Sequence, residues 1–523
     1  MKDYSFGNYI CALRLRSGLS QFQLGTLVGV SDKAVSKWEN GDAKPRIGTC
    51  YRLAEVLGVT IDELLSCETN NKVYARKELD EMNSHLWDQA YSQLSIFGEK
   101  PPIICYSRLA TEKQVLYETD IVQIFAVIGQ INKVVGDFEF PVLANSPVTS
   151  SFTAWLLGAT RVNPLPPHYR CPKCGKTEFV PNIDCGFDLP PKRCTCGEVL
   201  IRDGHNIPFE EYEMDKQLGT EIELRVSEKT KEIAISTIRN FYNGVAEVLP
   251  VKYIFPDGRP TSIEKYVILD NKSSKPQVQD DGYWYAIPED FHEWRNKEIV
   301  YTIVCSHELQ KLHTLQELTY QKSPDLIQLA TPTMAERLYQ KKRKKFGFLD
   351  GMTKRMDENE AHNFNLLLHT YGFLYGTGEW PEFSAGDDKY VNGDEESLIM
   401  QGRVSLHELP VFREDVWSDI SVALSRDGIL DKGIAFQVVN DIRRGRYLFK
   451  GMSKECEEIL RTIELPEWYP EYLKKVRYLF PKGHSVSHMI LDIVLEWYAI
   501  EFPREYSEVS KLDELFESGS ISQ

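Results

Sequence analysis

The sequence predicts an α+β protein with several domains, and three observations support that prediction. The chain has 523 residues, which is more than one hydrophobic core usually organises. Its first part places apolar side chains at helical spacing around a glycine turn. Farther on, cysteines gather between positions 171 and 196, and the stretch GTEIEL at 219–224 then alternates charged and apolar residues as a β-strand does.

Composition places the chain among ordinary globular proteins, with 42% apolar and 26% charged residues. The N-terminus has no apolar core of the signal-peptide type, and no run of about 18 apolar residues could span a membrane. Cysteines in a long chain without a secretion signal indicate reduced thiols. We therefore expect a cytoplasmic protein that makes no membrane contact.

The formal net charge is −16. Acidic and basic residues balance over residues 1–70, so the excess acid lies downstream. Such an excess weakens non-specific binding to nucleic acid but is compatible with a basic cleft.

Residues 19–45 have the order of elements of a helix-turn-helix. Ser20 is placed to cap a first helix, whose apolar face would consist of Phe22, Leu24, Leu27 and Val28. Gly29 supplies the turn. Ser31 begins a second helix, which would carry inward Ala34, Val35 and Trp38.

This stretch resembles the Cro/C1-type DNA-binding domain, which implies that the second helix is a recognition helix and that double-stranded DNA is a partner. By that resemblance, base edges would be read by Ser31, Asp32, Lys33 and Ser36. Phosphates would be held by Gln21, Lys37 and Asn40. The alternative is a helical bundle used for dimer contacts alone, and the polar outer face of the second helix favours DNA.

Four of the clustered cysteines form two close pairs, Cys171 with Cys174 and Cys194 with Cys196. Two close pairs of thiolates on tight turns suit tetrahedral Zn²⁺, and four cysteine ligands leave no open position, so the site would be structural. Two alternatives remain: Cys185 replaces one of the four, or the thiols are free after loss of the metal.

The flanks of the cluster, VNPLPPHYRCPKC before it and DGHNIPFEEY after it, resemble the polymerase region of PolC-type DNA polymerase III α subunits. Further similar stretches follow the same order, among them SPVTSSFTAWL upstream and DIRRGRYLF and RYLFPKGHSVSHMI downstream. The resemblance covers roughly residues 105–515. The exonuclease and phosphoesterase domains of that family have no counterpart here.

Together the two resemblances imply a division into four parts. We expect an all-α helix-turn-helix head at 1–68, a helical linker at 69–104, a mixed-sheet palm region at 105–330 with a zinc-ribbon-like insertion at 165–210, and a mostly helical fingers region at 331–523.

A polymerase of this family needs a glycine-rich loop whose backbone N–H groups approach the triphosphate. The matching residues 142–152 read VLANSPVTSSF and contain no glycine. Asn145 stands where the family has arginine, and Pro147 lacks an N–H. We expect this loop to be disabled.

The resemblance places Glu221 and Glu223 at the family's paired catalytic aspartates. Glutamate is one methylene longer, Mg²⁺ requires near-octahedral geometry, and a shift of about 1 Å can cost about 100-fold in rate. The third aspartate maps to Ile303, which cannot bind a metal, and we expect Glu308 on the other side of the strand. We therefore expect a degenerate site, with Mg²⁺ a cofactor only if the site is catalytic. A solvated strand face is the alternative.

Cationic residues of the fingers-like region match nucleotide-contacting positions of the family, namely Arg477, Lys482 and His484. Two further basic groups are Arg443, Arg444 and Arg446, and the run KKRKKF at 341–346. The run could contact DNA. For all three groups the alternative is a solvated helical surface.

The leading hypothesis is a sequence-specific DNA-binding regulator of transcription or replication, with a catalytically inactive polymerase body, as in a mobile-element or phage-related setting. The body could bind primer-template DNA, a nucleotide or replication proteins. One alternative is an active divergent polymerase or nucleotidyltransferase. Another is a plain transcription factor whose C-terminal body forms a homodimer or binds an effector.

Overall fold

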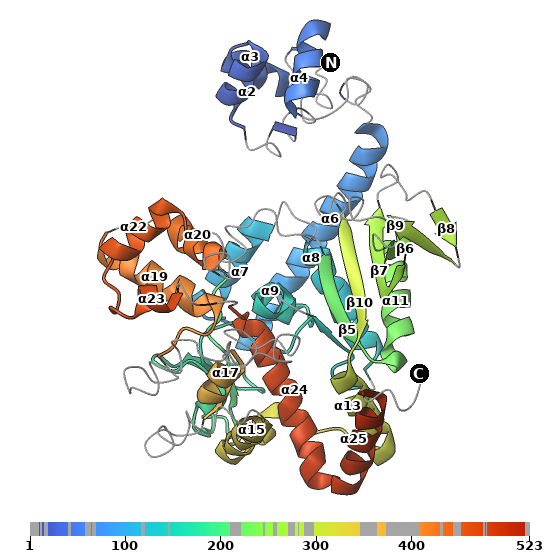
Figure 1. The fold of residues 1–523 in the computed structure, drawn as a ribbon, viewed down its shortest axis with the longest axis vertical. Coiled ribbons are helices and arrows are strands. Elements are labelled where there is room, and N and C mark those ends of the chain that lie inside the picture. The colour runs from blue at the N-terminus through green and yellow to red at the C-terminus, as the bar shows by residue number, and fades with distance from the viewer. Residues whose placement is uncertain are drawn as a thin grey trace. The chain divides into compact units, whose positions relative to one another are not determined.

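The structure is a computed structural model. It describes residues 10, 13–14, 19–39, 43–57, 64, 69–116, 121–136, 138–144, 147–209, 221–243, 246–254, 259–269, 278–280, 282–286, 298–345, 363–372, 408–428, 432–442, 451–473, 476 and 479–517. The chain forms two compact units, the smaller made mainly of residues 1–84 and the larger of most of the rest (Figure 1). None of the described helices is long and apolar enough to cross a membrane.

The smaller unit is helical. Its main helices are α2 (Gln21–Val28), α3 (Asp32–Glu39) and α4 (Ile47–Leu57). Ser20 caps α2 by accepting a hydrogen bond from Gln23 N, and Gly29 ends it with φ of 75°, as predicted. Ser31 Oγ accepts from Ala34 N at 3.2 Å and so begins α3, also as predicted.

The predicted apolar face of α2 is wrong in part. Leu24 and Val28 are buried, but Phe22 and Leu27 are 69% and 57% exposed. At 3.6 residues per turn, a residue two positions before Leu24 points to the opposite side of the helix. The inward face instead includes Gly25, where a Cβ would lie 2.9 Å from Val30 O, so the turn packs directly on the helix.

The stretch predicted as a linker is helical where it is described. It contains α6 (Thr69–Gln93) and the short helix η1 (Leu94–Phe97), and α7 (Ile103–Leu116) follows.

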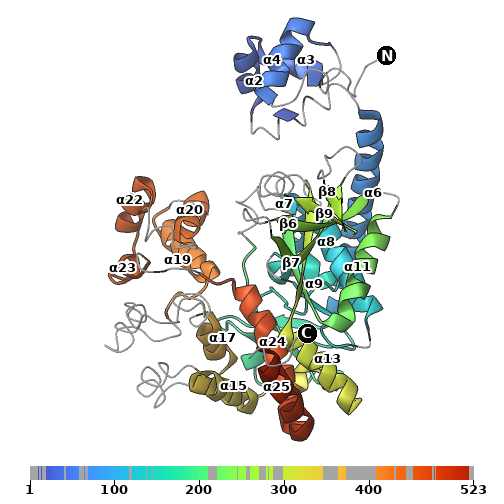
Figure 2. The same ribbon diagram turned by 45° about the vertical axis from the view of Figure 1, so that its right-hand side comes forward.

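The larger unit is built on a mixed sheet of seven strands (Figures 1 and 2). Its order is β1 (Val142–Ala144), β5 (Glu221–Val226), β10 (Ile299–Cys305), β7 (Pro260–Leu269), β6 (Glu247–Ile254), β9 (Tyr283–Ala286) and β8 (Val278–Asp280). Strand β5, next to the edge strand β1, runs antiparallel to β1 and parallel to β10, and β10 runs antiparallel to β7.

Alternation along β5 separates the two faces of the sheet, as the sequence predicts. Ile222, Leu224 and Val226 are buried, and the residues between them are half-buried. The buried side meets α11 (Glu228–Tyr242), where Tyr242 OH lies 3.0 Å from Tyr301 OH of β10, and α11 packs in turn on α8 (Ile121–Val134). We call the opposite side, which carries Glu221 and Glu223, the open face.

A second sheet carries the cysteine cluster. Its three strands are β2 (His168–Arg170), β3 (Thr177–Phe179) and β4 (Ile201–Asp203), in the order β3-β2-β4. The buried Arg202 donates to the carbonyls of Leu189, Ile327 and Ala330. Asp188 accepts from the backbone N–H groups of Phe364 and Asn365, which caps α17 (Phe364–Gly372). Residues 168–203, here the cysteine module, are thereby joined to the helices that follow.

The described part of the chain beyond the sheet is mostly helical, as predicted. The helices are α13 (His307–Thr319), α14 (Leu326–Leu329), α15 (Pro332–Lys345), α17, α19 (Arg413–Arg426), α20 (Lys432–Ile442), α22 (Lys454–Thr462), α23 (Tyr469–Leu473), α24 (Lys482–Glu501) and α25 (Pro503–Glu517). The long helix α24 packs along α15 and α17, and α25 lies beside α13 (Figure 2).

Candidate functional site

The two glutamates singled out in the sequence lie next to each other on the open face of β5. Their side chains are 27% and 34% exposed, so solvent reaches both carboxylates. In the register of the sheet, Thr302 of β10 pairs with Glu223, and Lys265 of β7 pairs with Thr302. Four strand positions therefore present their side chains to the same small area.

Each carboxylate in this area is held by a cation of the protein. Lys265 Nζ forms an ion pair with Glu221 Oε1 and also donates to Thr302 Oγ1 at 2.9 Å. The Thr302 hydroxyl donates in turn to Glu221 Oε1 at 2.8 Å. Arg225 Nε donates to Glu223 Oε1 at 2.9 Å. We call Glu221, Glu223, Arg225, Lys265 and Thr302 the paired-charge cluster.

Ile303, the position predicted for the third carboxylate, lies on the opposite face of the sheet from Glu221 and Glu223. Ile303 is buried, pairs with Leu224 and points toward α11, because neighbouring residues of a strand face opposite sides. The β10 residue that pairs with Glu223 on the open face is Thr302, which is not acidic either. Glu308 lies in the first turn of α13 and accepts from Ser306 Oγ at 2.8 Å. Within the described residues, the four clustered cysteines form the one group of three or more His, Cys, Asp or Glu that could hold a metal.

The loop that follows β1 is buried and held from within the protein. Its described part contains η2 (Val148–Ser150) and leads into α9 (Phe152–Leu156), while Asn145 lies outside the described residues. Arg108 donates to Ser150 O at 2.8 Å and to Glu112 Oε1 at 2.7 Å. Glu112 also accepts from the N–H groups of Phe152 and Thr153. The sequence reading missed this pair, although its spacing of four residues on a helix could have suggested it.

The start of α24 packs directly on this loop. A Cβ on Gly483 would lie 2.6 Å from Thr149 O, so only glycine allows the approach. Lys482 and His484 are both buried, and Lys482 N donates to Glu414 Oε2 at 3.0 Å. The structure thus brings two of the predicted nucleotide-binding residues to the loop. Arg477 lies outside the described residues, as do Arg443, Arg444 and Arg446.

Two histidines of α24 form a neutral pair. His484 Nε2 and His488 Nε2 lie 3.0 Å apart, so one ring must donate and the other accept. Burial lowers the pKa of His488 to about 4 and lowers that of His484 well below its usual value. Neither imidazole offers a positive charge to a triphosphate near pH 7.

The basic run at 341–346 begins with internal ion pairs. Lys341 Nζ lies 2.7 Å from Glu496 Oε2, and Lys342 Nζ lies 2.8 Å from Asp492 Oδ2. These two lysines join α15 to α24, and the side chain of Lys341 is still 53% exposed, so DNA contact by this run stays a prediction. The side chains of 343–346 lie outside the described residues.

The four cysteines of the cysteine module converge. All four Sγ atoms lie within 4.8 Å of one another, with Cys171 Sγ 3.4 Å from Cys196 Sγ and Cys174 Sγ 3.7 Å from Cys194 Sγ. Tetrahedral Zn²⁺ with bonds of about 2.3 Å would place sulfur atoms about 3.8 Å apart, which the residues fit. Cys185, the alternative ligand, is buried elsewhere with its Sγ 3.5 Å from His205 Nδ1.

The predicted DNA-reading residues lie on the outer side of α3 and its start. Ser31, Asp32, Lys33 and Lys37 are exposed, and Ser36 is half-buried. Gln21 is half-buried and donates to Glu39 Oε2 at 2.7 Å, where Arg14 also binds Glu39. Asn40 lies outside the described residues.

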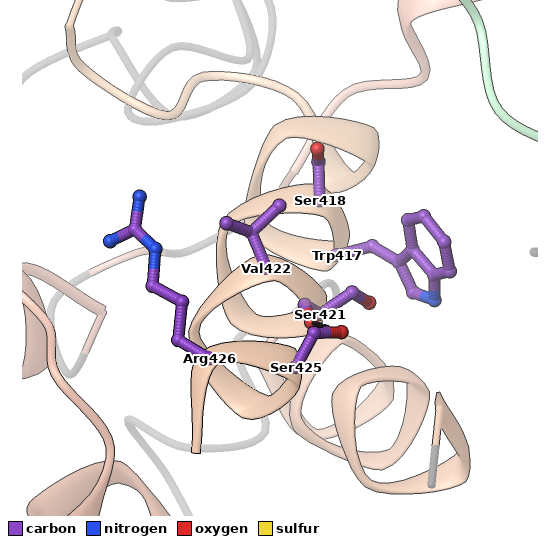
Figure 3. A pocket seen from close by; sticks show the side chains of 6 residues that line it. All are labelled: Trp417, Ser418, Ser421, Val422, Ser425 and Arg426. Carbon is purple, nitrogen blue, oxygen red and sulfur yellow. Dashed lines mark hydrogen bonds between the residues drawn. The ribbon is translucent and has the colours of Figure 1, made fainter. Parts of the chain in front are cut away.

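A shallow hollow of about 460 Å³ lies along α19, and none of its lining residues is one that the sequence singled out. Figure 3 shows its six lining side chains on that one helix, namely Trp417, Ser418, Ser421, Val422, Ser425 and Arg426. Its lining includes three serine hydroxyls but no carboxylate, thiol or imidazole, so it offers no general base to activate a serine and no usual metal ligand.

Comparison with known proteins agrees with both resemblances. Residues 12–64 match the helix-turn-helix family. The chain is 25% identical over 479 residues to the DNA polymerase III PolC-type of Bacillus cereus, covering 79% of this chain and 32% of that protein. It is 26% identical over 476 residues to that of Clostridium perfringens, with coverage of 79% and 31%. It is 25% identical over 469 residues to that of Thermotoga maritima, covering 79% of this chain and 33% of that protein. The chain spans about a third of the length of these curated relatives.

Proposed function

We propose that this protein is a sequence-specific DNA-binding regulator whose helix-turn-helix reads an operator and whose polymerase-like body is catalytically inactive. The observation that carries the proposal is the pairing of Glu221 with Lys265 and of Glu223 with Arg225. Similarity to PolC-type polymerases suggests that these glutamates stand where a polymerase binds its metal ions. In this chain each glutamate is instead bound by a cation of the protein, which is the reason we propose for inactivity.

The residues present do not fit a pair of Mg²⁺ ions. Two-metal nucleotidyl transfer places the ions about 3.5–4 Å apart between carboxylates, each at about 2.0–2.1 Å from its ligand oxygens. Here an ammonium and a guanidinium already lie at the carboxylate oxygens. The neighbouring residue of β10 on the open face is Thr302, a neutral side chain in place of a third carboxylate.

The regulatory role follows from the two parts of the chain. The exposed polar side of α3 suits the major groove, where side chains read base edges. A body similar to a replicative polymerase could bind primer-template DNA or a replication protein and compete with an active polymerase for it. By binding the operator and competing in this way, the protein would control transcription or replication there.

We further propose that Cys171, Cys174, Cys194 and Cys196 hold a structural Zn²⁺. Four thiolates complete its tetrahedral coordination, so no position remains for substrate or water. The metal would fix the cysteine module, whose Arg202 and Asp188 hold the helices that follow.

Primer extension by the full-length protein tests the inactivity, with Mg²⁺ and separately with Mn²⁺, beside a Glu221→Ala/Glu223→Ala variant. We expect no incorporation in any reaction. Incorporation by the wild type that disappears in the variant would contradict the proposal.

The DNA-binding role is tested by footprinting on a selected operator, where Lys33→Ala should remove the footprint; an unchanged footprint would refute the assignment of α3.

An active divergent polymerase is the second candidate, and one observation favours it. In the described part of the loop after β1, Arg108 and Glu112 hold the backbone at Ser150 and Phe152, and α24 packs on Thr149. The same extension assay decides between the two candidates.

A further inference from the structure

We infer that the cysteine module anchors the segment that joins the helix-turn-helix unit to the larger unit, and that Zn²⁺ at its four cysteines controls this anchor. The segment is residues 94–98, which contain η1 and follow α6 directly along the chain. We call it the anchor segment. The inference rests on the proposed Zn²⁺ site and goes beyond it, because it gives the metal a regulatory effect on the tether of the DNA-binding unit.

The anchor segment meets one of the two cysteine turns backbone against backbone. A Cβ on Gly175 would lie 2.1 Å from Gly98 N, and a Cβ on Gly98 would lie 3.2 Å from Cys174 O. Only two glycines allow so close an approach. Cys174 is therefore a predicted Zn²⁺ ligand through its thiol and a neighbour of the anchor segment through its carbonyl oxygen.

The second cysteine turn shows that this contact is not a general need of such turns. Gly197 follows Cys196 as Gly175 follows Cys174, and each glycine donates its N–H to the carbonyl of the first cysteine in its pair, at 2.9 and 3.0 Å. Within the described part of the chain, however, nothing lies within 4 Å of a Cβ placed on Gly197. The anchor segment thus covers one of two similar turns and leaves the other open.

Phe97 extends the contact from the turn to the neighbouring strand. Its side chain is buried, and its ring centre lies 6.0 Å from that of His168 and 5.8 Å from the guanidinium carbon of Arg170, both in β2. The same ring lies 6.1 Å from Phe152 and 6.0 Å from Trp155 of α9. The anchor segment therefore packs on both the cysteine module and α9, and loss of the module would remove one of its two supports.

The covered turn is small, and bound metal would fix it. Its backbone is held by short hydrogen bonds, such as Gly175 N–H to Cys171 O at 3.0 Å and Cys171 N–H to Lys176 O at 2.9 Å. Zn²⁺ on all four thiolates would tie this turn to the second cysteine pair. Elements with few buried contacts open locally, so the turn and the segment on it should open together when the metal is lost. Zinc occupancy thereby sets how firmly the larger unit holds the chain that leads from the DNA-binding unit.

Hydrogen–deuterium exchange of the full-length protein tests the inference, once with Zn²⁺ loaded and once with Zn²⁺ removed by a chelator. We expect amide exchange in the anchor segment to become about tenfold faster when the metal is removed. Exchange in α11 should not change, because α11 packs on α8 and the main sheet. Zinc content measured in the same samples separates two failures. If the chain binds and releases Zn²⁺ with no change in the exchange of the anchor segment, the inference alone is wrong; if the chain binds no Zn²⁺, the proposed metal site is wrong as well.

The coupling must be reciprocal, so the anchor segment should in turn favour metal binding. Gly98 has φ of 93° and ψ of −175°, a conformation essentially restricted to glycine, so Gly98→Ala should move the segment off the turn without altering a cysteine. We expect Zn²⁺ affinity, measured by competition with a chromogenic chelator, to fall about tenfold. Gly282→Ala is the matched control, since Gly282 has φ of 79° and open space for a Cβ, and it should bind Zn²⁺ as the wild type does. Wild-type affinity in Gly98→Ala would contradict the inference.

A second pair of variants tests the same contact from the cysteine module. Gly175→Ala forces a methyl group against Gly98 N, whereas Gly197→Ala has a comparable positive φ but room for the methyl group. Loaded with Zn²⁺, Gly175→Ala should show the fast exchange of the metal-free wild type in the anchor segment, and Gly197→Ala should keep the slow exchange. Equal exchange in the two variants would overturn the inference. If a substitution prevents folding, the metal dependence of exchange in the wild type decides by itself.

Discussion

Gly483 is the residue at which the long helix α24 touches the loop after β1. An added Cβ would lie 2.6 Å from Thr149 O, a backbone atom that cannot turn away as a flexible side chain would. We expect Gly483→Ala to lower the free energy of unfolding by about 1–3 kcal/mol, the usual cost of overpacking. Chemical denaturation of the full-length protein measures it.

Gly48 provides the control for that substitution, since nothing lies within 4 Å of a Cβ placed there. Gly48→Ala lies in α4 and should leave stability unchanged or raise it slightly, because alanine favours a helix over glycine. Equal stability of the Gly483→Ala variant and the wild type would contradict the prediction, because it would mean that the loop moves away from the added Cβ at no cost in free energy.

At the scale of single residues, the alternation of GTEIEL was enough to predict that Glu221 and Glu223 share a face. Lys265 could not be found in the same way, since it reaches Glu221 only because β7 pairs with β10 and β10 with β5. Strand pairing between distant segments is set by the whole sheet. The misplacement of Ile303 by one position has the same origin, because a shift of one residue along a strand reverses the face.

At the scale of elements, the cysteine module is the part of the fold to which we assign the proposed Zn²⁺. We expect one Zn²⁺ per chain by elemental analysis, and its loss in Cys194→Ser. Far-UV circular dichroism and proteolysis should then show loosening of residues 168–203. Cys305→Ser, which changes an exposed cysteine outside the cluster, is the matched control and should retain the metal. A zinc-free wild type with an intact module would contradict the assignment.

The cap of α17 gives the stability of the chain a pH dependence. Burial raises the pKa of Asp188 to about 6, although the N–H groups of Phe364 and Asn365 oppose the rise. A carboxyl with a raised pKa in the folded state binds its proton more tightly there than in the unfolded chain. Its contribution therefore favours folding at low pH and is lost as the pH increases from about 4 to about 6.

Asp188→Asn tests this pH dependence while keeping an oxygen for the α17 cap. The unfolding free energy of the variant should fall less steeply than that of the wild type between pH 4 and 6, by up to about 1.4 kcal/mol per pH unit. Urea denaturation across that range measures the difference. Parallel profiles for the two proteins would mean that Asp188 does not titrate there.

For the whole molecule, the order of parts along the chain could be predicted from short motifs, because caps, turns and cysteine spacing are local. The helical character of the first unit, the mixed sheet and the mostly helical remainder all follow that prediction. What depends on contacts between distant segments could not be predicted. Examples are the burial of Lys482 at the start of α24 and the ion pairs by which Lys341 and Lys342 join α15 to α24.

The paired-charge cluster also has an evolutionary consequence. Its two cations and its threonine lie on three different strands, and each occupies a place that metal chemistry would need to be empty or acidic. Replacing Lys265 alone would leave Arg225 on Glu223, and replacing both would still leave Thr302 neutral. On the proposal that the body is catalytically inactive, a lineage that reached this arrangement has no single-step return to catalysis, so selection could act on other uses of the fold without the risk that one reversion would restore nucleotide incorporation.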